Sequence, residues 1–135
     1  MKAKMQVAAT GLLCVLGVFW CAEIIGRGKW MNKELWEKAV AFHGHECPGL
    51  AIGFKACQAA AEKMGIGVSE DEEIVCITEN DACGVDAVQA ILSCTMGKGN
   101  LLYHGTGKQA FSFFDRKNNK KLRVCLKPKK HDEMD

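Results

Sequence analysis

Three stretches of the chain carry apolar residues at the three- and four-residue spacing of an amphipathic helix. Asn32 precedes the first stretch as a candidate N-cap, and Gly65, of a type that commonly ends helices, follows the second. A cap in the Asp81 to Cys83 region starts the third. The predicted helices cover residues 32–42, 48–64 and about 83–94.

Four shorter runs are rich in β-branched and aromatic residues, which is typical of strands. The polar residues 117–120 separate the last two runs and predict a hairpin turn. The order of elements is helix, helix, strand, helix and three strands. It predicts an α+β fold in which helices cover one side of a mainly antiparallel sheet. The predicted strands cover residues 74–78, 101–104, 109–115 and 122–126.

The first thirty residues have a different pattern, with a basic start and an apolar run from Val7 to Ala22. We expect residues 1–30 to be an apolar extension, residues 31–127 a core domain and residues 128–135 a polar tail. An over-extended gene start is one interpretation, since Met31 begins a new helical pattern. A signal anchor through residues 5–26 is the alternative, although the apolar run is shorter than the roughly 20 residues that span a bilayer.

Composition narrows the possible functions. The 135 residues suffice for one domain with a core, and the formal charge of +2 indicates no nucleic-acid partner. We expect the protein to associate with a membrane only if the N-terminal segment acts as an anchor. Eight cysteines without a CxxC pair argue against a zinc ribbon and a thioredoxin-like motif. We expect reduced thiols and a cytoplasmic protein.

The potential metal ligands are most concentrated between the first two predicted helices. His43, His45 and Cys47 fall within five residues, and Pro48 follows at a position that suits the first residue of a helix. Cys47 is therefore a predicted N-cap, where the helix dipole favours the thiolate. Imidazole and thiolate ligands favour zinc, or iron or nickel, over magnesium. A buried histidine and cysteine beside an ordinary turn is the alternative interpretation.

Two further cysteines lie at the ends of predicted elements. Cys83 follows the first predicted strand, and Cys94 precedes a glycine-containing loop. We expect both to join the cluster as metal ligands, with Cys47 and Cys83 also candidates for a catalytic or redox thiol. In the loop, Lys98 and Asn100 are candidate cofactor contacts, and a tight glycine turn is the alternative. Asn80, Asp81 and Asp86 are candidates to orient a ligand imidazole.

Four sequence blocks follow one another along the chain. They are Phe42-His43-Gly44-His45-x-Cys47-Pro48-Gly49-Leu50-Ala51-x-Gly53, Glu79-Asn80-Asp81-x-Cys83-x-x-Asp86-Ala87-x-Gln89, Cys94-Thr95-x-Gly97-Lys98-Gly99-Asn100-Leu101 and Gly107-Lys108-x-Ala110-Phe111. In this order the blocks resemble the FmdE family, which takes its name from formylmethanofuran dehydrogenase. The resemblance runs from about Met31 to Leu126, and the chain lacks the cysteine pairs of the C-terminal zinc finger in fuller members. It therefore resembles the core domain alone.

The resemblance implies an α+β core that forms a homodimer and binds a metal, commonly zinc, near the His-Gly-His turn. It also implies association with the molybdenum or tungsten enzyme that reduces carbon dioxide onto methanofuran. We therefore expect an accessory or regulatory metal-binding domain. A stand-alone metal- or cysteine-dependent enzyme is the alternative, and a metal that only holds the fold together is a third interpretation.

Overall fold

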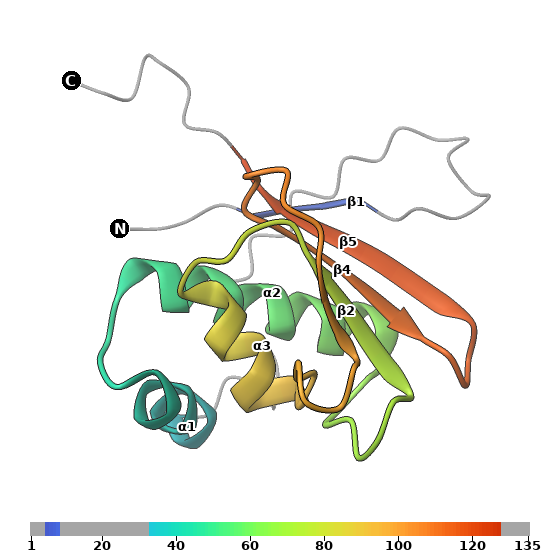
Figure 1. Cartoon of the computed structure of the whole chain (residues 1–135), viewed down its shortest axis with the longest axis horizontal. Coiled ribbons are helices and arrows are strands. Elements are labelled where there is room, and N and C mark those ends of the chain that lie inside the picture. The colour runs from blue at the N-terminus through green and yellow to red at the C-terminus, as the bar shows by residue number, and fades with distance from the viewer. Residues whose placement is uncertain (1–4, 9–32, 128–135) are drawn as a thin grey trace.

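The computed structural model describes residues 5–8 and 33–127. Each of the three predicted helices and four predicted strands is present, with ends within two residues of the expected ones. Figure 1 shows the three helices gathered on one side of the sheet. The helices are α1 (Lys33–His43), α2 (Pro48–Met64) and α3 (Gly84–Leu92). The strands are β1 (Met5–Ala8), β2 (Ile74–Thr78), β3 (Leu101–Tyr103), β4 (Ala110–Asp115) and β5 (Lys120–Leu126).

The sheet has five strands in the order β1-β5-β4-β2-β3. The pair β2 and β3 is parallel, with α3 in the crossover between them, and the other neighbouring pairs are antiparallel. This confirms the predicted α+β fold with a mainly antiparallel sheet. The crossover carries the chain from the end of β2 through a short loop into the start of α3, where the candidate site residue Cys83 lies.

Strand β1 was not predicted from the sequence. It pairs antiparallel with β5, from Met5 opposite Leu126 to Ala8 opposite Arg123. The rest of the predicted N-terminal extension, residues 1–4 and 9–30, and the predicted tail 128–135 lie outside the described residues. Among the residues that the structure describes, no helix combines the length and the apolar composition needed to cross a membrane.

The core lies between the sheet and the helices. Alternate residues of β4 and β5 point inward, so Phe111, Phe113, Leu122 and Val124 are buried. Burying a side chain of this size contributes about 1.5–3 kcal/mol to stability. Facing them, α2 offers small side chains, among them three fully or nearly fully buried alanines, Ala56, Ala59 and Ala60. Small residues let this helix lie close to the sheet.

Helices α2 and α3 touch through their backbones. A Cβ atom at Gly53 would overlap the carbonyl oxygen of Gly84 and stand 2.5 Å from its Cα atom. A Cβ atom at Gly84 would in turn stand 3.2 Å from both the Gly49 carbonyl oxygen and the Gly53 Cα. Only glycine fits this crossing, and the crossing brings the N-terminal ends of both helices together.

The hairpin between β4 and β5 is the turn that the sequence predicted. Asp115 closes it, because its carboxylate accepts hydrogen bonds from the backbone N–H groups of Lys117 and Asn118 at 3.0 and 3.2 Å. Asn119 has a φ of 50°, a conformation that asparagine tolerates better than most residues. These hydrogen bonds lower the pKa of Asp115, the largest effect coming from the Asn118 side chain.

Candidate metal centre

The His-Gly-His turn begins where α1 ends. His43 is the last residue of the helix, and the Gly44 N–H donates to the Val40 carbonyl at 2.7 Å. Gly44 has a φ of 101°, which side chains other than glycine rarely adopt. The turn therefore reverses the chain within one residue, so that His45 comes back beside His43 with ring centroids 4.6 Å apart.

Cys47 caps the start of α2, as the sequence predicted. Its backbone is extended, and its Sγ accepts a hydrogen bond from the Leu50 N–H at 3.3 Å, with Pro48 in the first helical turn. This N–H group is the largest cause of a lowered pKa for the Cys47 thiol, because it stabilises the thiolate. The helix start thus favours the form of sulfur that binds metals.

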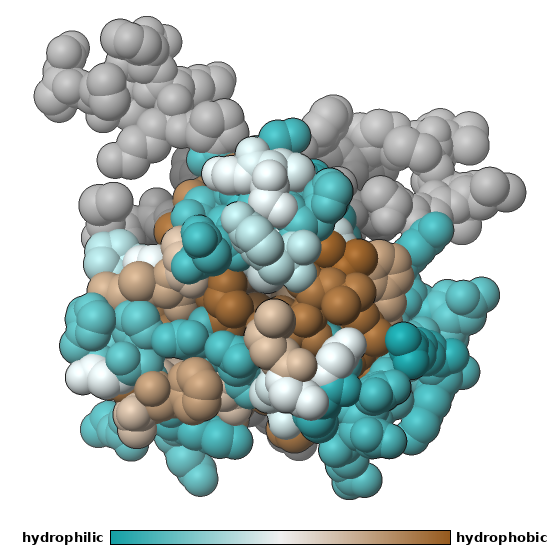
Figure 2. Space-filling view, viewed as in Figure 1, coloured by the Kyte–Doolittle hydropathy of each residue, from teal (hydrophilic) through white to brown (hydrophobic). Residues whose placement is uncertain are grey.

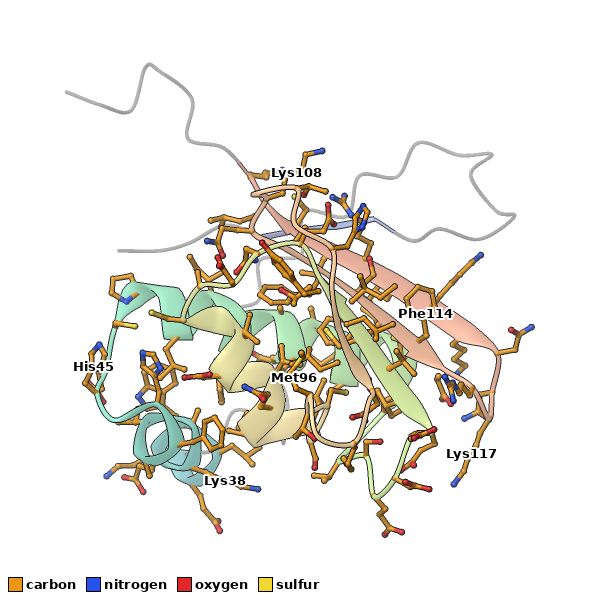
Figure 3. The ribbon with its side chains drawn as sticks, in the orientation of Figure 1. Lys38, His45, Met96, Lys108, Phe114 and Lys117 are labelled. Atoms are coloured by element: carbon orange, nitrogen blue, oxygen red, sulfur yellow. The ribbon has the colours of Figure 1, made fainter. Side chains whose placement is uncertain are left out.

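Three donor atoms from this turn lie within reach of one ion. One ligand atom each from His43, His45 and Cys47 all fall within 4.8 Å of one another. The His43 Nε2 and Cys47 Sγ atoms are 3.6 Å apart. His43 and Cys47 are half-buried whereas His45 is exposed, so the group lies at the surface and is open to solvent on the His45 side. Figure 3 shows His45 at the outer edge of the molecule, beyond the start of α2.

Asp86 fixes the orientation of the His43 ring. Its Oδ2 lies 2.7 Å from His43 Nδ1, and the Gln89 side-chain amide donates to its Oδ1 at 3.3 Å. The Asp86 carboxylate is the largest cause of the raised pKa of His43. Because Nδ1 is engaged, Nε2 is the ring atom left to face Cys47. Of the three residues expected as candidates for this role, Asp86 makes the contact.

The other two candidates lie in the turn before α3. The Asn80 side-chain oxygen accepts from the Ala82 N–H at 3.0 Å, and its amide donates to the Lys108 carbonyl at 3.1 Å. Asp81 is exposed. Asn80 therefore shapes the loop that carries the chain from β2 to Cys83.

Cys83 lies at the start of α3 and faces Cys47 across Gly49. A Cβ atom at Gly49 would stand 3.6 Å from Cys83 Sγ and 4.0 Å from Cys47 Sγ. A hydrogen bond with Cys47 is the largest cause of a raised pKa for the Cys83 thiol. The glycines of the helix crossing make this approach possible. A second sulfur atom thus lies beside the group of three.

Cys94, also expected in the cluster, lies elsewhere. Cys83 precedes α3 and Cys94 follows it, and at a rise of about 1.5 Å per residue the helix alone separates its two ends by about 12 Å. Cys94 is fully buried in the core, its Sγ is 3.6 Å from the Ile74 carbonyl, and burial raises its pKa to about 12. A neutral buried thiol at this distance cannot share an ion with Cys83.

Lys98 and Asn100, the expected cofactor contacts, hold their own loop together. The Lys98 ammonium donates to the Ser69 carbonyl at 2.9 Å and to the Ser93 hydroxyl at 3.1 Å. The Asn100 side chain is fully buried, and its oxygen accepts from the Thr95 N–H at 2.9 Å. These contacts support the alternative that the sequence left open, a tight structural turn.

Two supporting contacts were not predicted. Gln89 donates a hydrogen bond to Asp86 from one helical turn away. The spacing of the two residues is visible in the sequence, but its role becomes clear only when the structure shows that Asp86 contacts His43. The Trp36 indole N–H donates to the Glu46 carboxylate at 3.1 Å, which ties α1 to the turn beside Cys47. No local pattern in the sequence marks that pair.

The donor types and the spacing of one donor pair suit a zinc ion. Tetrahedral zinc with nitrogen at about 2.1 Å and sulfur at about 2.3 Å separates these two donors by about 3.6 Å. That is the separation of His43 Nε2 and Cys47 Sγ. A carboxylate on the far nitrogen of a ligand histidine is also the usual arrangement around zinc, and Asp86 provides it.

Comparisons with known proteins identify a family and one curated relative. The family model FmdE, described as "Molybdenum formylmethanofuran dehydrogenase operon", matches residues 42–135. A "Probable S-adenosyl-L-methionine-binding protein" from Archaeoglobus fulgidus is 38% identical over 93 residues, which is 66% of this chain and 25% of that protein.

A solved structure agrees with the family model. The crystal structure of a protein from Syntrophus aciditrophicus, described as a "tungsten formylmethanofuran dehydrogenase subunit e (fmde)-like protein", matches with a TM-score of 0.55 and 32% identity. That match covers 68% of this chain and 49% of the other. The chain thus spans about a quarter of the curated relative and about half of the solved one. The fold, the His-Gly-His turn and the family model together show that this chain belongs to the FmdE family.

Proposed function

We propose that this chain is a zinc-binding domain that acts as an accessory or regulatory part of a formylmethanofuran dehydrogenase-like redox enzyme containing molybdenum or tungsten. The observation that carries the metal part is the convergence of His43, His45 and Cys47 donor atoms within 4.8 Å. The accessory part rests on the operon for which the family is named. We also expect a homodimer in a cytoplasmic setting.

The proposed ligands are His43, His45, Cys47 and Cys83. When bound, zinc would hold the two helix starts together if all four ligands bind, or polarise a substrate oxygen if one position stays open. Asp86 would keep the His43 proton on Nδ1, so that Nε2 remains a donor. The exposure of His45 makes it the ligand that a substrate or partner would meet first.

Metal analysis tests this proposal. The purified full chain, prepared with zinc present and then desalted, is expected to carry about one zinc ion per chain by elemental mass spectrometry. The His45→Ala variant is expected to lose most of it, because one of few ligands is removed. Cys125→Ser is the control, since Cys125 lies in β5 and its Sγ contacts the Leu126 carbonyl.

Two results would count against the proposal. If the wild type and His45→Ala carry the same amount of metal, the ion binds at another site. If all three proteins carry equally little metal, the chain has no metal site. If elemental analysis finds iron or nickel instead of zinc, the proposed ligands stand and the identity of the bound ion changes.

A stand-alone enzyme with Cys47 as nucleophile is the second candidate, favoured by the lowered pKa of its thiol. Alkylation by iodoacetamide separates the two functions. In the zinc-loaded protein we expect Cys47 to stay unmodified at pH 7, and after chelation to react first, well below the usual thiol pKa of about 8.5. Peptide mass spectrometry identifies the modified residue.

The buried thiols supply the internal control for this experiment. Burial raises the pKa values of Cys57 and Cys94, so both are expected to stay unmodified throughout. Rapid modification of Cys47 in the zinc-loaded protein would favour the enzyme instead.

A further inference from the structure

The face of the sheet opposite the helices carries its own set of side chains. Strand register places Val75, Phe114 and Lys121 in one row across β2, β4 and β5. The neighbouring row of Cys76, Phe113 and Leu122 is buried under the helices. Because side chains alternate along a strand, the first row faces the other way. We call this side the outer sheet face.

One end of the outer sheet face is covered by the chain itself. The loop after β3 folds back, and the N–H groups of Thr106 and Gly107 donate to the Glu79 carbonyl at 3.2 and 3.0 Å. Beneath the loop, the Glu79 carboxylate accepts from Arg123 at 2.7 and 3.1 Å and from the Thr106 hydroxyl at 2.9 Å. That end is thus closed by a satisfied ion pair.

The other end is an open groove of about 500 Å³. Its apolar floor consists of Val75, Ile77 and Phe114. Leu102 pairs with Ile77 from the edge strand β3 and is 48% exposed. Figure 2 shows hydrophobic surface gathered over this part of the sheet with hydrophilic surface around it. Among the described strands β3 is an edge strand, and an apolar strip beside a sheet edge is typical of an interaction surface.

The charged residues that line this groove are mostly basic. They are Arg116, Lys120 and Lys121, beside the single acidic residue Asp115. Asp115 is buried, and its carboxylate is occupied by the hairpin N–H groups and the Asn118 amide. The Arg116 guanidinium lies 3.7 Å from the Glu72 carboxylate, and the Lys120 ammonium donates to the Met64 carbonyl at 3.4 Å. Within residues 33–127, no hydrogen bond or ion pair engages the Lys121 ammonium. Lys121 is therefore the positive charge that the groove offers beside its apolar floor.

We infer that this groove docks an extended segment of a partner protein in which carboxylate side chains alternate with apolar ones. Alternation suits the groove, because an extended segment can place its apolar side chains on the floor while its carboxylates remain within reach of the long, exposed Lys121 side chain. A small molecule would keep much of its surface in water here, since the groove is only partly enclosed, whereas binding pockets usually bury most of a ligand.

A second copy of this chain suits the groove less well. In a two-fold interface each patch meets its own equivalent, and Lys121 lies directly beside Phe114 in the register. Face-to-face packing of the two aromatic side chains would bring the two ammonium groups close together. Like charges at an interface oppose association, whereas an acidic partner is attracted.

The groove and the metal centre lie on different sides of the domain. Figure 3 shows His45 at one edge of the molecule, and Phe114 and Lys117 at the opposite edge. A partner seated in the groove therefore leaves the metal centre accessible. This docking does not depend on bound metal, so the two proposals can fail separately.

Peptide binding tests the inference. The probe is a synthetic peptide in which glutamate alternates with valine, and its matched control carries lysine in place of glutamate. Calorimetry with the full chain is expected to show saturable binding of the glutamate peptide and none of the lysine peptide. Lys121→Glu is expected to weaken binding at least tenfold, and Phe114→Ser to abolish it. Lys38→Glu on α1, exposed on the helical side, is the control and keeps wild-type binding.

Three results would overturn the inference. Absence of binding to the wild type would do so, as would equal binding to Lys121→Glu and Lys38→Glu. The third is sedimentation of the wild type as a dimer that Phe114→Ser converts to a monomer, since the face would then join two copies. Raising the salt concentration is expected to weaken the glutamate complex.

Discussion

Replacing Gly53 by alanine is expected to destabilise the folded protein by about 3 kcal/mol, even though alanine gains up to about 1 kcal/mol over glycine within a helix. The added Cβ atom would overlap the Gly84 carbonyl oxygen and stand 2.5 Å from Gly84 Cα. Neither is the flexible end of a side chain, so α2 and α3 must move apart. In thermal unfolding, a loss of this size lowers Tm by about 12–24 °C for a domain of about 100 residues.

Gly97→Ala is the matched control for this substitution. A Cβ atom at Gly97 meets no atom within 4 Å, so its Tm is expected to stay within about 2 °C of wild type. Because the crossing also sets the distance between the Cys47 and Cys83 sulfur atoms, Gly53→Ala is expected to weaken zinc binding as well. An unchanged Tm in Gly53→Ala would show that the two helices are not in backbone contact.

Local signals were enough to predict most elements. The first turn of α2 was recognisable because Cys47 and Pro48 suit the N-cap and first helical positions, and Gly65 ended the helix in a left-handed conformation with a φ of 68°. The His-Gly-His turn was predictable for the same reason, since all three candidate ligands come from one short segment. Such features depend only on residues close in sequence.

Contacts between distant segments could not be predicted in the same way. Asp86 meets His43 only because α1 packs on α3, and Gly53 meets Gly84 only because two helices cross. A glycine inside a helical pattern does not show which backbone it will face. Strand β1 was missed because its four residues carry no distinctive strand signal and pair with the last strand of the chain.

Cys94 and Asn100 show how a family motif can mislead about roles. Both belong to one sequence block and were expected near a ligand, yet both are fully buried where the loop between α3 and β3 closes on the core. A buried asparagine can be required for the fold of a loop as strictly as a metal ligand is required for binding. The fold of this loop depends on hydrogen bonds that the sequence does not display.

Asn100→Asp is therefore expected to be the most damaging single substitution in this loop. The Asn100 amide nitrogen lies 2.9–3.4 Å from four acceptor oxygen atoms, those of the Ile74, Asp71 and Ser93 carbonyls and the Ser69 hydroxyl. A carboxylate in its place would face these acceptors without a proton to offer. Burying such an unpaired charge is expected to cost at least about 4 kcal/mol at pH 7, measured by urea denaturation.

The pH dependence of this loss distinguishes charge from shape. Burial among acceptors raises the pKa of the introduced carboxyl above its unfolded value of about 3.9. The penalty is therefore smallest below that unfolded pKa, where the group is protonated in both states, and grows as the pH rises towards the folded pKa. Asn100→Ala removes the same hydrogen bonds without adding a charge, so its loss is expected to change little over the same pH range. If the unfolding free energies of the two variants change with pH in parallel, the site tolerates a carboxylate. The four oxygen atoms would then not all need the Asn100 amide as their hydrogen-bond donor.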